Sequence, residues 1–151
     1  MHIEENVCES LLGTLLMNDK SKDTTNVRKD MEKLMIKDDL WLKKANGKFL
    51  KPHPKFSFTP EHRKRFCKFI KGVKLPDGFG SNFKRKVSDK EDNISGMKSH
   101  DYHIMMQRLM PLGVRGYLDP TISTPIIELC SFFKQICDRN LMTCDMEDAR
   151  E

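Results

Sequence analysis

The stretch Gly96–Pro111, GMKSHDYHIMMQRLMP, determines the fold that the sequence predicts. Ser99 precedes an apolar run, and a serine hydroxyl accepts hydrogen bonds from the free N–H groups of a first helical turn. Pro111 has no N–H and clashes with the preceding turn, so it ends or kinks the helix that Ser99 begins. We expect a central helix here, with an apolar face formed by Ile104, Met105, Met106, Leu109 and Met110.

Similar signals predict helices on both sides of this stretch. Each combines a residue that caps a first turn with apolar residues at helical spacing. The predicted starts are His2, Asp23 or Thr24, Thr59-Pro60 and Thr124-Pro125. No alternation typical of strands persists for more than a few residues, and we expect residues 49–54 to be an extended connector. The sequence therefore predicts an all-α fold of five or six helices with a basic connector region containing proline and glycine, and an incomplete domain.

The charge of the chain is concentrated in its middle third. The net charge is +5, but the segment Lys43–Lys90 contains fifteen basic and three acidic residues, whereas both flanking segments are acidic. A segment this basic is attracted to phosphate backbones or to acidic proteins, with an affinity that falls steeply with salt. The charge alone does not decide whether the ligand is a nucleic acid or an acidic protein.

The five cysteines do not form a recognisable covalent or metal framework. Their number is odd and no C-x-x-C pair occurs, which argues against disulfides and zinc knuckles. Cys130, Cys137 and Cys144 recur every seventh residue, so a continuous helix would place them on one face, where we expect buried, small apolar residues. No apolar run approaches the roughly 18 residues of a membrane span, and we expect no membrane contact.

Four segments resemble, in the right order, segments of plant CACTA (En/Spm-type) transposases. The family patterns are MHIEKNV, KSKDTxNAR, PDGYxSN and KSHDCHxxMQxLLP, and the matching segments are Met1–Val7, Lys20–Arg28, Pro76–Asn82 and Lys98–Pro111. The resemblance covers essentially the whole chain. It implies that residues 1–17 are the end of a transposase catalytic core and that residues 18–151 belong to the domain of unknown function that follows, truncated at its carboxyl end.

The resemblance also assigns a role to Glu4. Transposases of this type cut and join DNA with acidic residues that hold two divalent metal ions, such as Mg²⁺, and Glu4 matches the last of these ligands. Glu5 stands where the family has lysine, and Tyr102 where it has cysteine. The other catalytic carboxylates of the family lie upstream of the matched segment, and one carboxylate cannot hold two metals. We expect the isolated chain to have no enzymatic activity and no cofactor, with Glu4 catalytic only within a complete transposase.

The basic segment supplies the candidates for nucleic-acid contact. They lie on the predicted third helix and after the turn at residues 76–82, and they are Arg63, Lys64, Arg65, Lys84, Arg85 and Lys86. A solvated basic face is the alternative interpretation. Lys84–Lys86 also resembles a nuclear import signal, and no Walker-type pattern indicates a nucleotide, so we expect DNA as a partner, a nuclear location and no small-molecule substrate.

His100, Asp101 and His103 are a candidate metal set at the start of the central helix. Two histidines three residues apart lie on one side of a helix, and an adjacent carboxylate can complete a metal site or orient a proton-transfer group. The set lacks the H-E-x-x-H spacing and an identifiable remote ligand. We favour the alternative, in which this segment caps the helix and fixes its entry by hydrogen bonds.

Overall fold

The computed structural model describes residues 2–76 and 82–137, which are mainly helical. The α-helices are α1 (His2–Leu16), α2 (Thr25–Lys33), α3 (Pro60–Gly72), α4 (Ser99–Ile104), α5 (Met110–Arg115) and α6 (Pro120–Ile136). Two short 3₁₀-helices, η1 (Asp38–Leu40) and η2 (Phe83–Arg85), and one π-helix, η3 (Met105–Leu109), join them. The strands are β1 (Lys43–Ala45), β2 (Lys48–Leu50), β3 (Val87–Ser88) and β4 (Asn93–Ile94).

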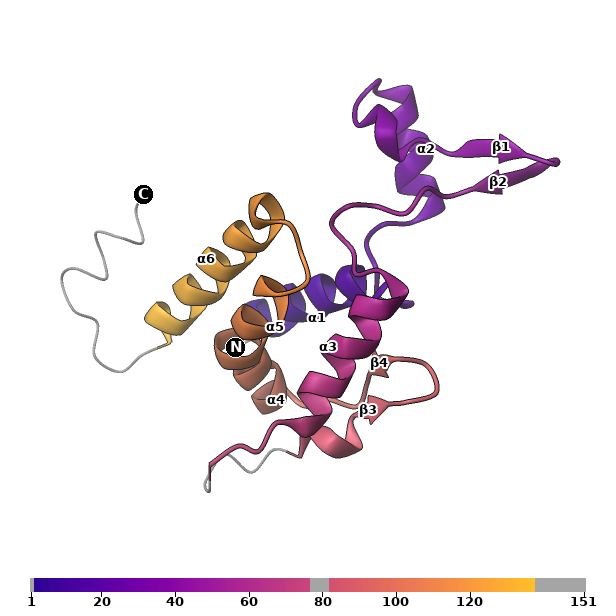
Figure 1. The fold of residues 1–151 in the computed structure, drawn as a ribbon. Coiled ribbons are helices and arrows are strands. Elements are labelled where there is room, and N and C mark those ends of the chain that lie inside the picture. The colour runs from indigo at the N-terminus through magenta and orange to yellow at the C-terminus, as the bar shows by residue number, and fades with distance from the viewer. Residues whose placement is uncertain (1, 77–81, 138–151) are drawn as a thin grey trace.

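A single hydrophobic core joins the first and last helices of the chain. α1 packs against α4, α3 against α5, and α5 against α6, so helices far apart in the sequence lie in contact (Figure 1). Met105, Met106 and Met110 are fully buried at its centre, as the apolar face of the central stretch predicts. None of the helices within residues 2–76 and 82–137 combines the length and apolar character of a membrane span.

The predicted central helix is a continuous helical path with a wider turn inside it. α4 passes directly into the π-helix η3, and α5 then carries Pro111 in its first turn. Because proline has no N–H, the carbonyl of Gln107 cannot receive the usual hydrogen bond from residue 111. The π-turn lies immediately before the residue that interrupts the ladder, and the helix does not end at Pro111 but continues to Arg115.

Ser99 is not the predicted cap of the central helix, but Asp101 of the same segment fixes its start by a hydrogen bond, as the favoured interpretation predicted. Lys98 is the capping residue of α4, and the Asp101 carboxylate accepts the Lys98 N–H at 2.8 Å. Asp101 also forms an ion pair with Lys86, whose Nζ lies 2.7 Å from the Asp101 carboxylate. Ser99 is therefore free to donate its hydroxyl to another helix, and it donates to Glu5 on α1 at 2.9 Å.

The strictly all-α prediction was also wrong, because the described residues include two antiparallel hairpins. β1 pairs with β2, and β3 pairs with β4. In the first hairpin Asn46 and Gly47 have φ values of 50° and 73°, the left-handed pair that closes a two-residue hairpin loop. The residues expected to form an extended connector after Phe49 begin instead as the second strand of this hairpin.

Residues 23–52, comprising α2, η1, β1 and β2, project from the body as a hairpin lobe (Figure 1). Its base is the fully buried Arg28, which donates to both carboxylate oxygens of Asp23 at 2.5 and 2.7 Å. Arg28 also donates to the carbonyls of Leu40 and Pro52 at 2.6 and 3.2 Å. One side chain thereby ties α2, η1 and the end of the hairpin together.

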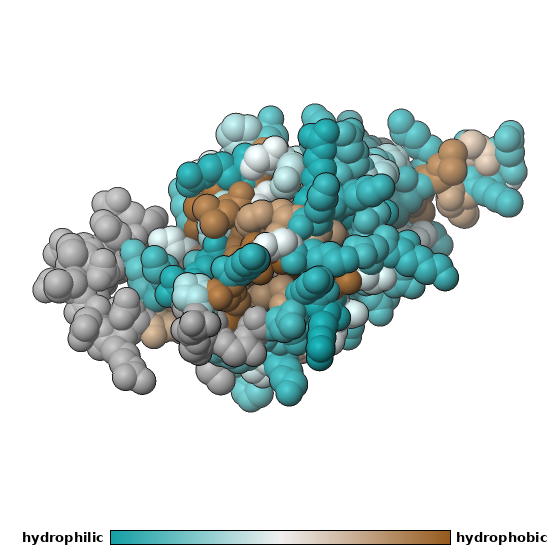
Figure 2. Space-filling view, turned by 60° about the horizontal axis from the view of Figure 1, so that its bottom comes forward, coloured by the Kyte–Doolittle hydropathy of each residue, from teal (hydrophilic) through white to brown (hydrophobic). Residues whose placement is uncertain are grey.

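The outer surface of the hairpin lobe differs from the expected packing of its helix. The apolar residues of α2 and its end were expected to mark an apolar face, yet Val27, Leu34 and Met35 are 37%, 69% and 75% exposed. Figure 2 shows a small apolar patch among hydrophilic side chains at the projecting end of the molecule. This lobe contributes little to the hydrophobic core and much to the accessible surface.

The last helix begins five residues earlier than predicted, at Pro120. Asp119 accepts the Thr121 N–H at 2.9 Å and caps it, so the cap and first-turn proline signal expected at Thr124-Pro125 occurs first at residues 119–120. Pro125 lies inside the helix. Cys130 and Phe133 are buried on its inner face, as the spacing predicted.

Candidate functional site

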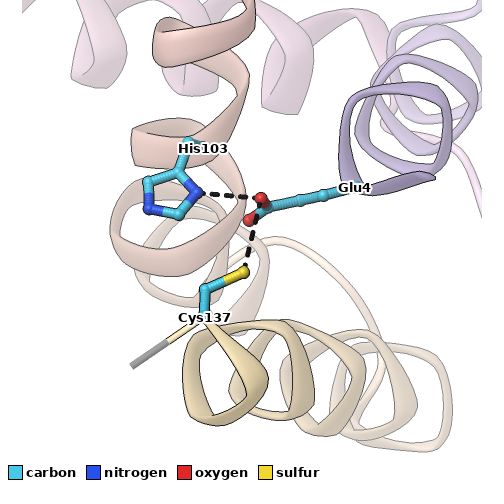
Figure 3. A group of neighbouring side chains, drawn as sticks. All are labelled: Glu4, His103 and Cys137. Atoms are coloured by element: carbon cyan, nitrogen blue, oxygen red, sulfur yellow. Dashed lines mark hydrogen bonds and ion pairs between the residues drawn. The ribbon is translucent and has the colours of Figure 1, made fainter. Parts of the chain in front are cut away.

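Glu4 lies at the centre of a polar cluster formed by α1, α4, η3 and the end of α6 (Figure 3). It is only 2% exposed, an unusual position for a carboxylate in a first helical turn. His103 Nδ1 lies 2.8 Å from Glu4 Oε2, and Gln107 Nε2 lies 3.0 Å from Glu4 Oε1. The thiol of Cys137 approaches Glu4 Oε2 at 4.0 Å. The residue that the resemblance assigns to catalysis is thus held between helices.

Two further glutamates of α1 bind the same face of α4. Glu5 accepts the hydroxyl of Ser99 at 2.9 Å, and Glu9 accepts the phenol of Tyr102 at 3.3 Å. Burial and the adjacent Glu9 carboxylate raise the pKa of Tyr102 to about 12, so the phenol stays a donor at neutral pH. The sequence segments around Glu4 and Ser99, more than ninety positions apart, therefore form one polar contact between helices.

The predicted metal set His100, Asp101 and His103 is divided in the structure. Asp101 is buried at the start of α4 and bound by the Lys98 N–H and Lys86, while His103 faces Glu4. His100 is exposed. Among the residues that the structure describes, the group of metal-binding side chains is Glu4, His103 and Cys137, whose ligand atoms all lie within 4.8 Å of one another.

The cysteines divide into three buried thiols and one accessible thiol within the described residues. Cys8, Cys67 and Cys130 are buried, and burial raises the pKa of Cys67 and of Cys130 to about 12. Cys137 was expected to be buried but is exposed, because α6 ends there. Burial of its sulfur and the nearby Glu4 carboxylate raise its pKa as well. Cys144 lies outside the described residues.

The Glu4 cluster contains donors of the kinds that bind transition metals. Imidazole, thiolate and carboxylate are the ligands of zinc sites, whereas Mg²⁺ prefers oxygen ligands with several bound waters. The neighbours of Glu4 therefore do not fit the Mg²⁺ that the resemblance implies. Sequence spacing could not reveal this group, because Glu4, His103 and Cys137 come from three different helices.

The six predicted nucleic-acid-binding residues fall into two groups. Lys64, Arg65, Lys84 and Arg85 are exposed on α3 and η2. Arg63 instead donates to the Leu16 carbonyl at the end of α1, at 3.0 Å, and Lys86 binds Asp101 and the Gly96 carbonyl. Arg63 and Lys86 therefore stabilise the fold. Of the glycine turn predicted beside them, residues 77–81 lie outside the described residues.

A second basic surface, on the hairpin lobe, was not among the predicted sites. Every residue of β1 and β2 is exposed, including Lys43, Lys44 and Lys48. Phe49 is 55% exposed, and the ammonium groups of Lys29 and Lys44 lie 5.6 and 5.5 Å from its ring centre. The sequence contains a signal for this hairpin that was missed, because an Asn-Gly pair is typical of a two-residue hairpin loop.

Comparisons with protein-family models, with curated proteins and with solved structures gave no match for this chain.

Proposed function

We propose that this chain is a DNA-binding module derived from a CACTA (En/Spm-type) transposase, which supports DNA transposition in a complete transposase and does not cut DNA by itself. The exposed β1–β2 hairpin is the observation that carries the DNA-binding part. A two-stranded ribbon fits the major groove of B-DNA, which also admits an α-helix. Three lysines on such a ribbon, Lys43, Lys44 and Lys48, would neutralise phosphates on either side of the groove.

The contacts at the base of the hairpin support this proposal. Arg28 is buried at its base, and Lys51 binds Asp23 at 3.0 Å, so the strands are held in a fixed position against α2 and η1 within the lobe. A preorganised arm loses less conformational freedom on binding than a flexible tail. Phe49, exposed between two ammonium groups, offers an aromatic face beside the positive charge.

The family part of the proposal is supported by the placement of the resembling segments. Glu4 on α1 contacts His103 and Gln107 of the Lys98–Pro111 segment, and Asp23 binds Arg28 within the Lys20–Arg28 segment. Residues shared with the family patterns therefore contact one another. The absence of catalysis is supported by the burial of Glu4, which keeps its carboxylate away from a phosphodiester.

Binding to a fluorescent DNA duplex tests the proposal. We compare the full chain with a hairpin variant that removes three charges, K43A/K44A/K48A, and with a variant of the other basic surface that removes four, K64A/R65A/K84A/R85A. The hairpin variant is expected to lose most of the affinity, and neither change touches the core, so both variants fold. Failure of the wild-type chain to bind duplex DNA at physiological salt refutes the proposal. Preferential loss in the α3–η2 variant moves the contact to that surface.

A second function has its own supporting observation, the exposed apolar residues of the hairpin lobe. Leu34 and Met35 are 69% and 75% exposed directly after α2. A domesticated module that binds an acidic protein partner would use such a mixture of apolar and basic groups. Binding to acidic peptides that falls in L34S/M35S as well as in K43A/K44A/K48A would favour it, because contact with DNA phosphates needs the lysines but not Leu34 and Met35. A nuclear location, which the DNA-binding function implies, is testable by imaging the tagged wild type and the K84A/R85A variant, which leaves the Lys86–Asp101 ion pair in place.

A further inference from the structure

We infer that Glu4, His103 and Cys137 form a zinc-binding site that joins the end of α6 to α1 and α4. The three residues lie on separate helices, and their ligand atoms lie within 4.8 Å of one another. This inference is independent of the proposed DNA contact, because the hairpin lobe contributes none of the three residues.

The contacts of Glu4 with His103 and Gln107 contain a conflict that a cation removes. An ionised carboxylate only accepts hydrogen bonds, so His103 Nδ1, 2.8 Å away, must donate to it. Gln107 Nε2 donates to Glu4 at 3.0 Å, but it also lies 3.1 Å from His103 Nδ1, where one donor then faces another. Rotating the amide places its carbonyl oxygen against the carboxylate instead. Either orientation leaves one contact between like groups.

A metal ion between these groups removes this conflict, because His103 Nδ1 then needs no proton. Neutral Nδ1, the Glu4 carboxylate and the Cys137 thiolate all direct lone pairs to the ion, while Gln107 Nε2 keeps its hydrogen bonds to Glu4 and to the Phe133 carbonyl, at 3.0 and 3.4 Å. Donors around a tetrahedral zinc ion are roughly 3.3–3.8 Å apart for bond lengths of about 2.0–2.3 Å. The observed 2.8 Å and 4.0 Å separations need only small side-chain movements to reach these values.

The surroundings select zinc and give it access. A mixed set of imidazole, thiolate and carboxylate suits zinc, whereas the oxygen-rich shell that Mg²⁺ needs is absent among the described neighbours of Glu4. Cys137 is exposed, so an ion can enter from that side, while Glu4 is buried and keeps solvent from the inner side. A metal bond at residue 137 would fix the carboxyl end of α6.

Metal analysis of the full chain, purified without an affinity tag, tests the inference. Zinc is added and unbound metal removed, and we expect stoichiometric zinc in the wild type. Co²⁺ in its place should give thiolate-to-cobalt charge-transfer absorption. C137S should lose this absorption, H103A should lose the bound metal, and Q107A should bind zinc about 10–100-fold more weakly. H100A is the matched control, a histidine one turn away that should retain the metal.

The results separate this site from its rivals. A folded wild type that retains no zinc and shows no cobalt absorption overturns the inference. Cobalt absorption that persists in C137S also overturns it, because another cysteine would then hold the metal. Loss of zinc in H100A would favour the set His100, Asp101 and His103. Circular dichroism of each variant shows whether it is folded, and the exposed Cys137 allows C137S to fold without metal.

Discussion

Replacing Arg28 by methionine is expected to destabilise the hairpin lobe by about 3 kcal/mol or more. Arg28 is fully buried, makes four hydrogen bonds, and faces an Asp23 side chain that is 6% exposed. Removing one partner of a buried ion pair costs about 3–5 kcal/mol, because the other charge stays buried without compensation. Lys51, 3.0 Å from Asp23, offsets part of that loss, which places the expected value near the lower limit.

The assay uses the single tryptophan, which lies in the same lobe. Trp41 donates its indole N–H to the Ile36 carbonyl at 2.9 Å, so its fluorescence reports unfolding of the lobe while circular dichroism reports the helices. Urea titration of R28M should move the fluorescence transition to lower urea than the dichroism transition. K33A, which removes an exposed ion pair with Asp30, is the control and should change stability by less than about 0.5 kcal/mol.

A double variant separates the charge effect from lost packing. Replacing a whole buried ion pair by groups of similar volume is often nearly neutral, so D23N/R28M should regain part of the stability that R28M loses. A loss below about 1 kcal/mol in R28M, or a double variant less stable than R28M, would refute the reasoning that the Asp23–Arg28 pair anchors the lobe. R28M should also weaken DNA binding, because the base of the hairpin frays.

Three further outcomes follow from the packing and the electrostatics. G113A should destabilise the chain by about 1–3 kcal/mol, measured by thermal unfolding, because the added Cβ would lie 2.3 Å from a ring carbon of Phe66. Burial alone would raise the pKa of Asp23, but its hydrogen bonds with Arg28 and Lys51 lower it below the unfolded value of about 3.9. The ionised Asp23 carboxylate therefore contributes fully to the free energy of unfolding above about pH 4, and this contribution is lost as the pH falls through its folded pKa. In an acid titration, the difference in stability between the wild type and D23N should shrink in that range. A difference that stays constant would contradict this. Iodoacetamide followed by mass spectrometry should leave Cys67 and Cys130 unmodified in the native chain, since their raised pKa values and burial suppress the thiolate, and rapid modification of either would contradict the packing.

The helices of the core could be predicted because their signals are local. Apolar spacing and capping residues lie within a few positions of each other, as at Thr59-Pro60, where Thr59 accepts the His62 N–H at 3.2 Å. The start of α6 was placed too late, because Asp119-Pro120 and Thr124-Pro125 give the same kind of signal, and the helix begins at the first of the two. The first hairpin was missed although Asn46-Gly47 marks it.

The candidate site could be predicted only in part. Glu4 was identified from the resemblance and His103 from its spacing, but their contact joins residues 99 positions apart, which no local pattern encodes. Ser99 was assigned to a cap because serine favours that position. In the fold the Lys98 carbonyl accepts the N–H groups of Asp101 and Tyr102, and the Asp101 carboxylate accepts the Lys98 N–H. The serine hydroxyl is left to donate to Glu5. Tertiary contacts therefore decided the role of these polar residues.

The salt dependence of duplex DNA binding tests the central proposal most directly. The logarithm of the binding constant falls with the logarithm of the salt concentration, and this slope is more negative by about 0.9 for each phosphate that a lysine neutralises. K43A/K44A/K48A should therefore make the slope less negative by about 2–3. The four-charge α3–η2 variant should change the slope less. Binding whose slope is unchanged by the hairpin variant, or no binding by the wild-type chain at low salt, would contradict the assignment of the hairpin as the DNA contact.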